Sequence, residues 1–324
     1  MSRLTEHVKT LLKLDAFALG IMHISNRYLG SVAAGKNMLK PGNGKYFRWK
    51  HGEVFYHKYG KGSPIVLLHH LDPAFSSYEW NEIVDDLATD HTVYTVDLPG
   101  CGRSTKKNDS YSNYYYVLFL TAFIKELVKS RCTVIASGYS SSFAIMTASV
   151  DSKLIDRIIA VNPKNVRELN RLPDSRSRAA SVLISLPIIG TTLYNIVQSR
   201  DNIDLRFSEE YLYNPFRSKD RFVDAFYEGA HFHEDGGKYL LASVQGRILA
   251  VNIIEALRKV GDRLMILYGD KAEKSDSVIS AYRKYNDSIV AYPVSGTRLV
   301  PHMERPQEFL SVCGSFLKEN DAEV

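Results

Sequence analysis

Short apolar runs alternate with longer stretches of helical periodicity along most of this chain. The runs predict strands at 46–50, 54–59, 63–69, 91–98, 132–137, 155–161, 263–268 and 288–294. The intervening stretches predict helices at 76–88, 113–129, from 141 onward, at 276–285 and at 306–318. Such alternation is typical of parallel strands joined by crossover helices. The first two runs are separated by three residues and predict an antiparallel hairpin at the sheet edge.

One long stretch breaks the alternation and divides the chain. Residues 163–260 keep helical periodicity with scattered Pro and Gly, so we predict an inserted helical lid there. Residues 46–162 and 261–324 then form an α/β core with a doubly wound, mostly parallel sheet.

Residues 1–45 are predicted as an N-terminal helical extension. Asp15 and His23 interrupt its apolar positions, so it is too broken to span a bilayer, and no transmembrane segment is predicted. Packing on the core and a weak contact with a membrane surface both remain open for this helix.

The composition says more about the possible partners of the protein than about its fold. A hydrophobic share of 45% and a charged share of 24% are ordinary for a globular protein. The net charge of +5 comes without a dense basic block, which argues against nucleic acid as a partner. Cys101, Cys132 and Cys313 lack metal-type spacing, so we predict no disulfide framework, metal or cofactor, and a reducing compartment such as the cytoplasm.

A stretch rich in glycine and serine joins the predicted strand 132–137 to the helix that follows. It reads Gly138-Tyr139-Ser140-Ser141-Ser142. This resembles the G-x-S-x-G pattern of a nucleophile elbow, with serine at the last position, where a small residue lets strand and helix approach. Such an elbow holds its serine in a strained turn at the helix N-terminus. The alternative is a run of helix N-cap residues.

Other ordered signals accompany this one. Asp97 to Ser104 reads D-x-x-G-x-G-x-S directly after a predicted strand, and Glu304-Arg305-Pro306 opens the last helix. With the His69-His70 pair after the strand 63–69, the chain over about 46–316 resembles the α/β-hydrolases. In that turn the glycines permit a tight bend, and Asp97 and Arg103 are expected to form buried hydrogen bonds that lock it.

The resemblance implies a nucleophile and an oxyanion hole. Ser140 would attack, and the backbone N–H groups of Leu71 and Ser141 would hold the oxyanion. His70 stands where the family usually carries glycine. The neighbouring pocket would include His69, His70, Tyr139 and Leu299, with His231 and His233 from the predicted lid.

The base and the acid depart from the family pattern. The family's histidine lies seven residues before the proline of the last turn, and that position is Leu299. A local shift would make His302 the base. Asp270, Glu273 and Asp276 are the candidate acids after the strand 263–268.

The predicted lid carries His231 and His233 near Glu234 and Asp235. Either histidine could complete a rearranged site from the lid side of the pocket. A metal would need both rings to face one way and a third ligand to converge.

Three functions therefore stay open. The first is a serine hydrolase acting through Ser140 on an ester, lactone or amide of a small, apolar molecule, with a relocated base. The second is a catalytically degenerate hydrolase-fold protein that binds a small ligand, which Leu299 favours. The third is a non-hydrolytic enzyme, because this fold also hosts chemistry that needs part of the triad.

Overall fold

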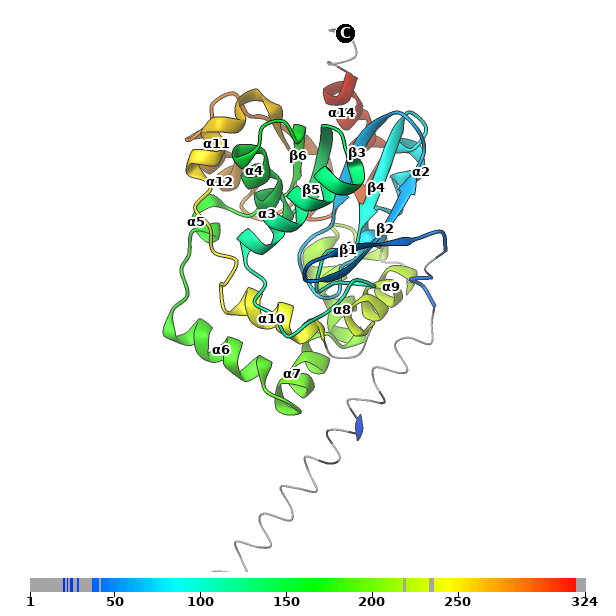
Figure 1. The fold of residues 1–324 in the computed structure, drawn as a ribbon, viewed down its shortest axis with the longest axis vertical. Helices are drawn as coiled ribbons and strands as arrows, with labels where there is room; N and C mark the ends of the chain where they lie inside the picture. Colours follow the sequence, from blue (N-terminus) through cyan, green and yellow to red (C-terminus); the bar gives the residue numbers. More distant parts are fainter. Residues whose placement is uncertain are drawn as a thin grey trace, which may run out of the picture.

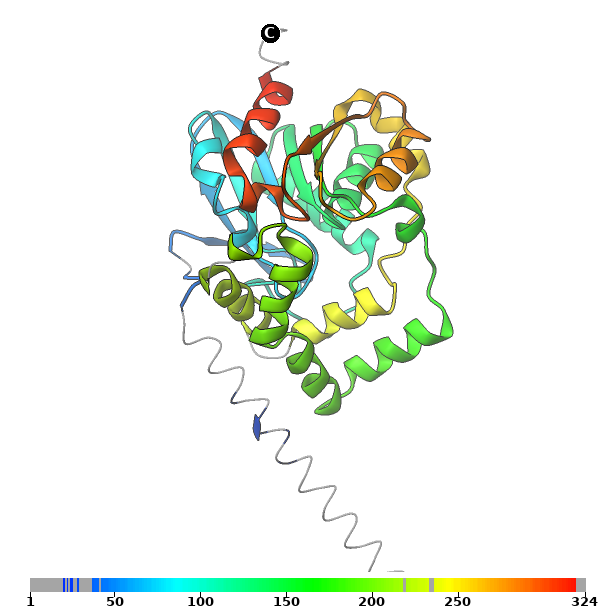
Figure 2. The ribbon, with the colours of Figure 1, turned by 180° about the vertical axis from the view of Figure 1, so that it is seen from behind.

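A mixed eight-stranded sheet with helices on both faces forms the centre of the molecule (Figures 1 and 2). The computed structural model describes residues 37–40, 42–217, 220–232 and 236–318, and in addition Gly20, Met22, Ile24, Ser25 and Tyr28. The predicted extension 1–45 therefore lies mostly outside the described residues, and its proposed membrane contact with it.

The strands follow the order β1-β2-β4-β3-β5-β6-β7-β8 across the sheet. Their bounds are β1 Lys45–Trp49, β2 Gly52–Tyr59, β3 Ser63–Leu68, β4 His91–Val96, β5 Cys132–Ser137, β6 Ile155–Val161, β7 Leu264–Gly269 and β8 Val290–Val294. The pairs β1–β2 and β2–β4 are antiparallel, and the other pairs are parallel. The predicted edge hairpin and the mostly parallel sheet are both confirmed.

The central strands are buried on both faces, which explains their continuous apolar runs. Alternate residues of β3 enter different clusters: Val66 and Leu68 pack with the helices of one face, and Ile65 and Leu67 with those of the other. Helices that flank the sheet are α2 Val84–Leu87, α3 Asn113–Ala122, α4 Ser140–Val150, α11 Ile254–Val260, α12 Ser275–Arg283 and α14 Pro306–Lys318.

One predicted helix is broken in the structure. In place of a helix over 76–88, a 3-10 turn at Ser77–Trp80 (η2) is followed by the short helix α2. The Ser77 amide donates to Asp97 Oδ1 at 2.8 Å, and Glu79 Oε2 accepts from the His70 amide at 2.6 Å. These buried contacts draw the segment into the interior and outweigh its helical periodicity.

Residues between β6 and β7, here called the β6–β7 segment, are mostly helical, as predicted for the insertion. They include α5 Val166–Leu169, α6 Ser175–Ser185, α7 Ile189–Val197, α8 Arg200–Arg206, a π-turn at Phe207–Tyr211, α9 Asp220–His231 and α10 Gly237–Gln245. Figures 1 and 2 show α6 to α10 beyond one end of the sheet. The last helix of the segment, α11, packs instead against α4 beside the sheet.

Within the described residues, no single helix is long and apolar enough to cross a membrane, although α6 and α7 pass that test together as a pair bent by 102°. The three cysteines are buried and free.

Candidate functional site

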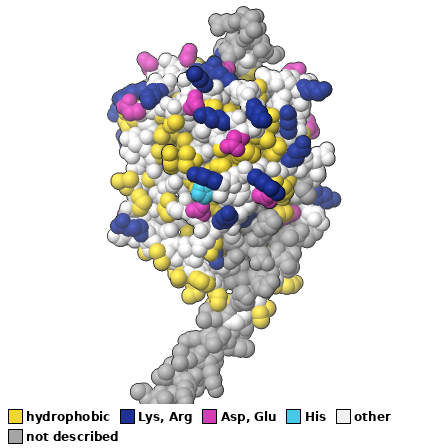
Figure 3. All heavy atoms as spheres, in the orientation of Figure 1, with side chains coloured by type: hydrophobic (Ala, Val, Ile, Leu, Met, Phe, Trp, Pro, Cys, Tyr) yellow, Lys and Arg dark blue, Asp and Glu magenta, His cyan; other side chains and the backbone are white. Residues whose placement is uncertain are grey.

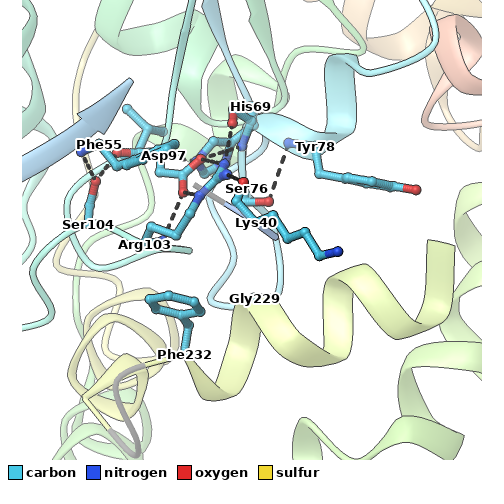
Figure 4. Close-up of polar contacts among 12 residues, drawn as sticks. Lys40, Phe55, His69, Ser76, Tyr78, Asp97, Arg103, Ser104, Gly229 and Phe232 are labelled. Atoms are coloured by element: carbon cyan, nitrogen blue, oxygen red, sulfur yellow. Dashed lines mark hydrogen bonds and ion pairs between the residues drawn. The ribbon is translucent and has the colours of Figure 1, made fainter. Parts of the chain in front are cut away.

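The turn after β4 is locked by a buried ion pair (Figure 4). Arg103 Nε lies 2.7 Å from Asp97 Oδ2, and its Nη2 lies 3.0 Å from Oδ1. Both side chains are almost fully buried. Burial alone would raise the pKa of Asp97, but the Arg103 guanidinium and two backbone N–H groups hold it well below its usual range. The predicted role of this turn as a buried structural lock is confirmed.

The same turn holds the β6–β7 segment through a half-buried lysine. Lys106 Nζ donates to the Gly229 carbonyl at 2.8 Å and to the Phe232 carbonyl at 2.7 Å, at the end of α9. A cation at the last carbonyls of a helix satisfies acceptors that the helix leaves unpaired. Burial lowers the pKa of Lys106 to about 8. The turn after β4 therefore fixes one helix of the segment above the sheet.

The turn from β5 into α4 is where an elbow nucleophile would stand. Strand β5 ends at Ser137, and α4 begins at Ser140. Between them Gly138 has φ +56°, a left-handed conformation that favours glycine, and Tyr139 is right-handed helical with φ −59°. The prediction that Ser140 holds the strained position of this turn is wrong, because Gly138 holds it.

Ser140 lies two residues further on, inside the first turn of α4. Its side chain is fully buried, and its hydroxyl donates to the His69 carbonyl at 2.6 Å. Ser141, the predicted oxyanion donor, is also buried: its amide points to the Gly138 carbonyl at 3.4 Å, and its hydroxyl donates to the Ala136 carbonyl at 2.8 Å. Both hydroxyls therefore connect α4 to the backbone of the sheet.

His70 occupies the space above Gly138. A Cβ atom added to Gly138 would lie 1.9 Å from His70 Nδ1, so the ring fills the volume that a side chain at position 138 would need. The ring packs edge-on against Phe75 with centroids 5.0 Å apart. Burial first, and then the charge of Lys164, lower the pKa of His70 to about 4. The ring is therefore neutral at pH 7.

His69, predicted to lie in the pocket, is a buried structural residue. Its Nδ1 donates to the His70 carbonyl at 2.7 Å, and its Nε2 accepts from the Leu98 amide at 2.9 Å. These two backbone partners fix the neutral tautomer with hydrogen on Nδ1. Burial lowers the pKa of His69, which keeps this tautomer in place. With both nitrogens occupied, the ring has no nitrogen to offer a substrate.

His302, the alternative base, faces a carboxylate that is not among the predicted acids. Its Nε2 lies 3.2 Å from Glu79 Oε1, although the ring is not aligned for a well-formed hydrogen bond, and it stacks on Trp80 at 4.3 Å. Burial would raise the pKa of Glu79, but the His302 and His69 rings and the His70 amide hold it below its usual range. His302 and Ser140 therefore have different partners, and the structure does not bring them together.

The three predicted acids also lie in different surroundings. Asp270 accepts hydrogen bonds from the Gly296 amide at 2.7 Å and the Thr297 amide at 3.4 Å, and pairs with Lys271 at 3.2 Å. It thus fixes the loop after β8. Glu273 faces the cavity described below, whereas Asp276 is exposed in the first turn of α12.

Leu299 lies on the wall of that cavity, as predicted for the pocket. Its amide donates to the Tyr211 carbonyl at 3.1 Å, and its carbonyl accepts from Asn162 Nδ2 at 3.0 Å. The backbone of this loop is thus fixed from both sides, and the Leu299 side chain is aliphatic, so it cannot accept a proton.

His231 of the β6–β7 segment does not provide a base to the cavity. His231 is buried, donates from Nδ1 to the Tyr227 carbonyl at 2.9 Å, and has its pKa lowered by burial to about 4. It does not line the cavity. His233, with Glu234 and Asp235, lies outside the described residues. No three His, Cys, Asp or Glu side chains of the described part are placed to hold a metal ion together.

A cavity of about 750 Å³ lies between the carboxyl ends of the strands and the β6–β7 segment. From the core, His70, Leu71, Tyr139 and Leu299 line it, and α6 contributes residues such as Ala180. Ser140, Ser141 and His302 are not among its lining residues within the described chain. This is the place where open α/β sheets bind their ligands.

Basic groups outnumber acidic ones around the cavity. Its charged lining residues are Lys164, Arg171, Arg176, Arg206, Arg247 and Lys274, against Asp72, Glu168, Glu210 and Glu273. Arg206 pairs with Asp72 at 3.4 Å, and Arg247 pairs with Asp174 at 2.6 Å. Arg171, Arg176 and Lys274 form no ion pair with another described residue. The cavity can therefore accept a negatively charged group.

Fold and cavity together define an α/β-hydrolase scaffold. The family model "Alpha/beta hydrolase family" matches residues 65–312, so the chain belongs to this family. A haloalkane dehalogenase of Agrobacterium fabrum is 27% identical over 127 residues, 39% of this chain and 41% of that protein. A soluble epoxide hydrolase of Corynebacterium sp. is 27% identical over 103 residues, 32% and 35% of the two chains. The matched stretches thus span well under half of these relatives.

Solved structures agree in fold over most of the chain. A serine hydrolase involved in carbazole degradation superposes with a TM-score of 0.70 at 16% identity, covering 86% of this chain and 99% of that one. A membrane phospholipase A superposes with a TM-score of 0.69 at 16% identity, covering 98% and 99%. At such identities the likeness concerns the fold, and the chemistry depends on this chain's own residues.

Proposed function

We propose that this protein is a hydrolase-fold binding protein without a serine–histidine pair, which holds a small organic anion in the cavity beneath the β6–β7 segment. The observation that carries the proposal is left-handed Gly138 between β5 and α4. In the family this strained turn presents the nucleophile, and glycine has no side chain to present.

A second position supports the same proposal. Leu299 takes the family's histidine position and lines the cavity. A serine hydroxyl is a poor nucleophile until a general base accepts its proton, and leucine cannot do so. The only route back to hydrolysis through Ser140 would need its buried hydroxyl to leave the His69 carbonyl and gain a base.

The ligand class follows from the cavity lining. Tyr139, Leu299 and Val244 offer apolar surface, and Arg171, Arg176 and Lys274 offer positive charge without an ion-pair partner among the described residues. Cavities of this size bind small molecules through apolar walls and a few oriented polar groups. We therefore propose a small, mostly apolar carboxylate or similar anion, with the β6–β7 segment acting as the lid.

The chemical half of the proposal is tested with a fluorophosphonate probe on the full chain. We expect no labelling of the wild-type protein and none of Ser140→Ala. A second variant combines Gly138→Ser, His70→Gly and Leu299→His, which restores a hydroxyl and a base at the two positions and removes the blocking ring. We expect probe adducts at position 138 in that variant, with Gly138→Ala in the same background as control. Wild-type labelling that disappears in Ser140→Ala would overturn the proposal in favour of a serine hydrolase.

The binding half is tested by thermal unfolding and calorimetry with octanoate, and with 1-octanol and octylamine as neutral and cationic controls. We expect octanoate to bind best of the three. Ala180→Trp on α6 should fill the cavity and abolish this binding while the protein stays folded. Equal binding of the three compounds, or octanoate binding unaffected by Ala180→Trp, would contradict the proposed ligand class and site.

A further inference from the structure

The outward side of helices α6 and α7 exposes a group of large apolar side chains. This outward α6–α7 face consists of Val182, Leu183, Leu186, Ile189, Ile196 and Val197, all exposed. Val182 is 64% exposed and Ile196 is 57% exposed. In Figure 3, which has the orientation of Figure 1, hydrophobic side chains gather at the lower end, where Figure 1 places α7. Contiguous exposed apolar surface of this kind marks an interaction site.

The opposite side of the same helices is firmly attached to the molecule. Tyr194 donates from its hydroxyl to the Ala230 carbonyl at 2.5 Å, and Lys238 Nζ donates to Thr191 Oγ1 at 2.8 Å. On α6, Asp174 and Ser177 form a capping box, and Ala180 lines the cavity. Because α7 is held at Tyr194 and Thr191, its exposed apolar side is a fixed surface feature of the folded protein.

A strained bend joins the two helices. Ile188 joins them with φ +53°, a conformation that a β-branched residue rarely adopts. A Cβ on Gly190 would lie 2.1 Å from the Ile184 carbonyl, so the end of α6 and the start of α7 are in close contact. The helices turn by 102° at this point. With this bend and with α7 bonded to α9 and α10, the two helices are held on the folded protein as an angled pair.

Charge indicates which kind of surface covers this face. Residues 175–200 contain no Asp or Glu. Of their three arginines, Arg178 is exposed, whereas Arg176 lines the cavity and Arg200 pairs with Asp220 and Asp224. The whole chain carries a formal charge of +5. An amphipathic element with apolar residues on one side and basic residues beside them binds the interface of anionic lipids.

We infer that the outward α6–α7 face docks this protein on an anionic lipid surface, with the apolar side chains entering the acyl boundary and Arg178 close to the head groups. This site differs from the cavity, and it stands whether or not the cavity binds an organic anion. Because Ala180 and Val182 lie on the same helix, docking also brings the cavity wall close to the lipid.

The test is sedimentation of the full chain with two kinds of vesicles, phosphatidylcholine alone and phosphatidylcholine mixed with phosphatidylglycerol. We expect binding to the mixed vesicles, weaker binding to the neutral ones, and a decrease with added salt. Val182→Glu combined with Ile196→Glu should weaken vesicle binding about tenfold or more. Arg178→Gln should reduce the preference for anionic lipid by a smaller factor.

Val150→Glu is the matched control, since Val150 is 68% exposed at the end of α4, outside this face. It should bind vesicles like the wild type. Circular dichroism during heating checks that every variant is folded. Vesicle binding that is unchanged in the Val182/Ile196 variant would overturn the inference and place the contact elsewhere on the chain. Absence of vesicle binding, with a dimer in sedimentation velocity that this variant abolishes, would also overturn it and assign the face to a second copy.

Discussion

Two turns at the carboxyl edge of the sheet, one after β4 and one after β5, differ in which of their groups are present. The turn after β4 contains a buried ion pair. Asp97 pairs with Arg103 and also accepts a hydrogen bond from the Ser77 amide. The turn after β5 keeps the strained backbone of an elbow, but at Gly138, with His70 packed over it. The groups that stabilise the fold are present, whereas we propose that the groups of a serine hydrolase are not.

This contrast has a physical basis. A buried ion pair cannot lose one member without leaving the other charge unpaired in the interior, so such a pair is costly to dismantle. A nucleophile adds little to stability and often strains its turn. A turn without a nucleophile is therefore compatible with a stable fold, and the following predictions test this difference between the two turns.

The largest effect is expected at the turn after β4. Arg103→Met leaves the buried Asp97 carboxylate without its cation and should lower the free energy of unfolding by about 3–5 kcal/mol, measured by urea denaturation. The control is Arg48→Met, because Arg48 pairs with Glu53 on the surface and should contribute about 0–1 kcal/mol. Equal losses in the two variants would remove the distinction drawn for the first turn.

A smaller loss is expected at the turn after β5. Gly138→Ser places a Cβ into the His70 ring and a non-glycine residue at positive φ, so we expect about 1–3 kcal/mol of destabilisation. His70→Gly in the same chain should recover part of this loss by removing the ring. If the double variant is no more stable than Gly138→Ser in a urea titration, the ring is not what limits position 138.

The stability of the protein at acidic pH should depend on the neutral His70 ring above Gly138. The pKa of His70 in the folded protein is about 4, below the ordinary 6.5 of an unfolded chain. The unfolded state therefore binds the proton first, and the stability contributed above pH 6.5 is lost as pH falls towards 4, at up to about 1.4 kcal/mol per pH unit. His70→Asn should flatten this part of the stability curve relative to wild type. Parallel curves for the two proteins would show that His70 does not contribute to it.

The smallest effect is expected for Ser140. Its hydroxyl makes one buried hydrogen bond to the His69 carbonyl, so Ser140→Ala should cost about 0.5–1.5 kcal/mol in thermal or urea unfolding. Octanoate affinity should not change, since Ser140 does not line the cavity. Ser315→Ala, on the exposed side of α14, serves as control and should be close to neutral. A large change in octanoate affinity for Ser140→Ala would place this residue in the binding site after all.

Sequence reasoning missed Gly138, although a signal was present. The stretch Ala136-Ser137-Gly138-Tyr139-Ser140 matches the small–x–x–x–small spacing of an elbow as well as the frame centred on Ser140 does. The first frame, Ala136 to Ser140, has Gly138 at its centre. The second frame, centred on Ser140, is easier to notice because its central residue is a serine. A predicted strand that ends at Ser137 leaves two residues before Ser140, and that distance favours the first frame.

Local patterns determined the greater part of the fold. Strand and helix periods depend on neighbours along the chain, so the edge hairpin, the bounds of β5 and β6 and the closing helix Pro306–Lys318 follow from the sequence. The structural role of the turn after β4 also follows from the sequence, because its glycines and its charged pair lie within a few residues of one another. The position of Leu299 follows from counting back from Pro306.

Long-range contacts decided the rest. The frame of the β5–α4 turn depends on where β5 leaves the sheet, and that is set by pairing of Ala136 with Leu68 on β3 and of Ser137 with Val161 on β6. The partner of His302 is Glu79, more than two hundred residues earlier in the chain. Exposure of Val182 and Ile196 depends on how α6 and α7 pack on the rest of the β6–β7 segment. Such contacts have no local sequence signature, because residues distant in the chain form them only when the chain has folded.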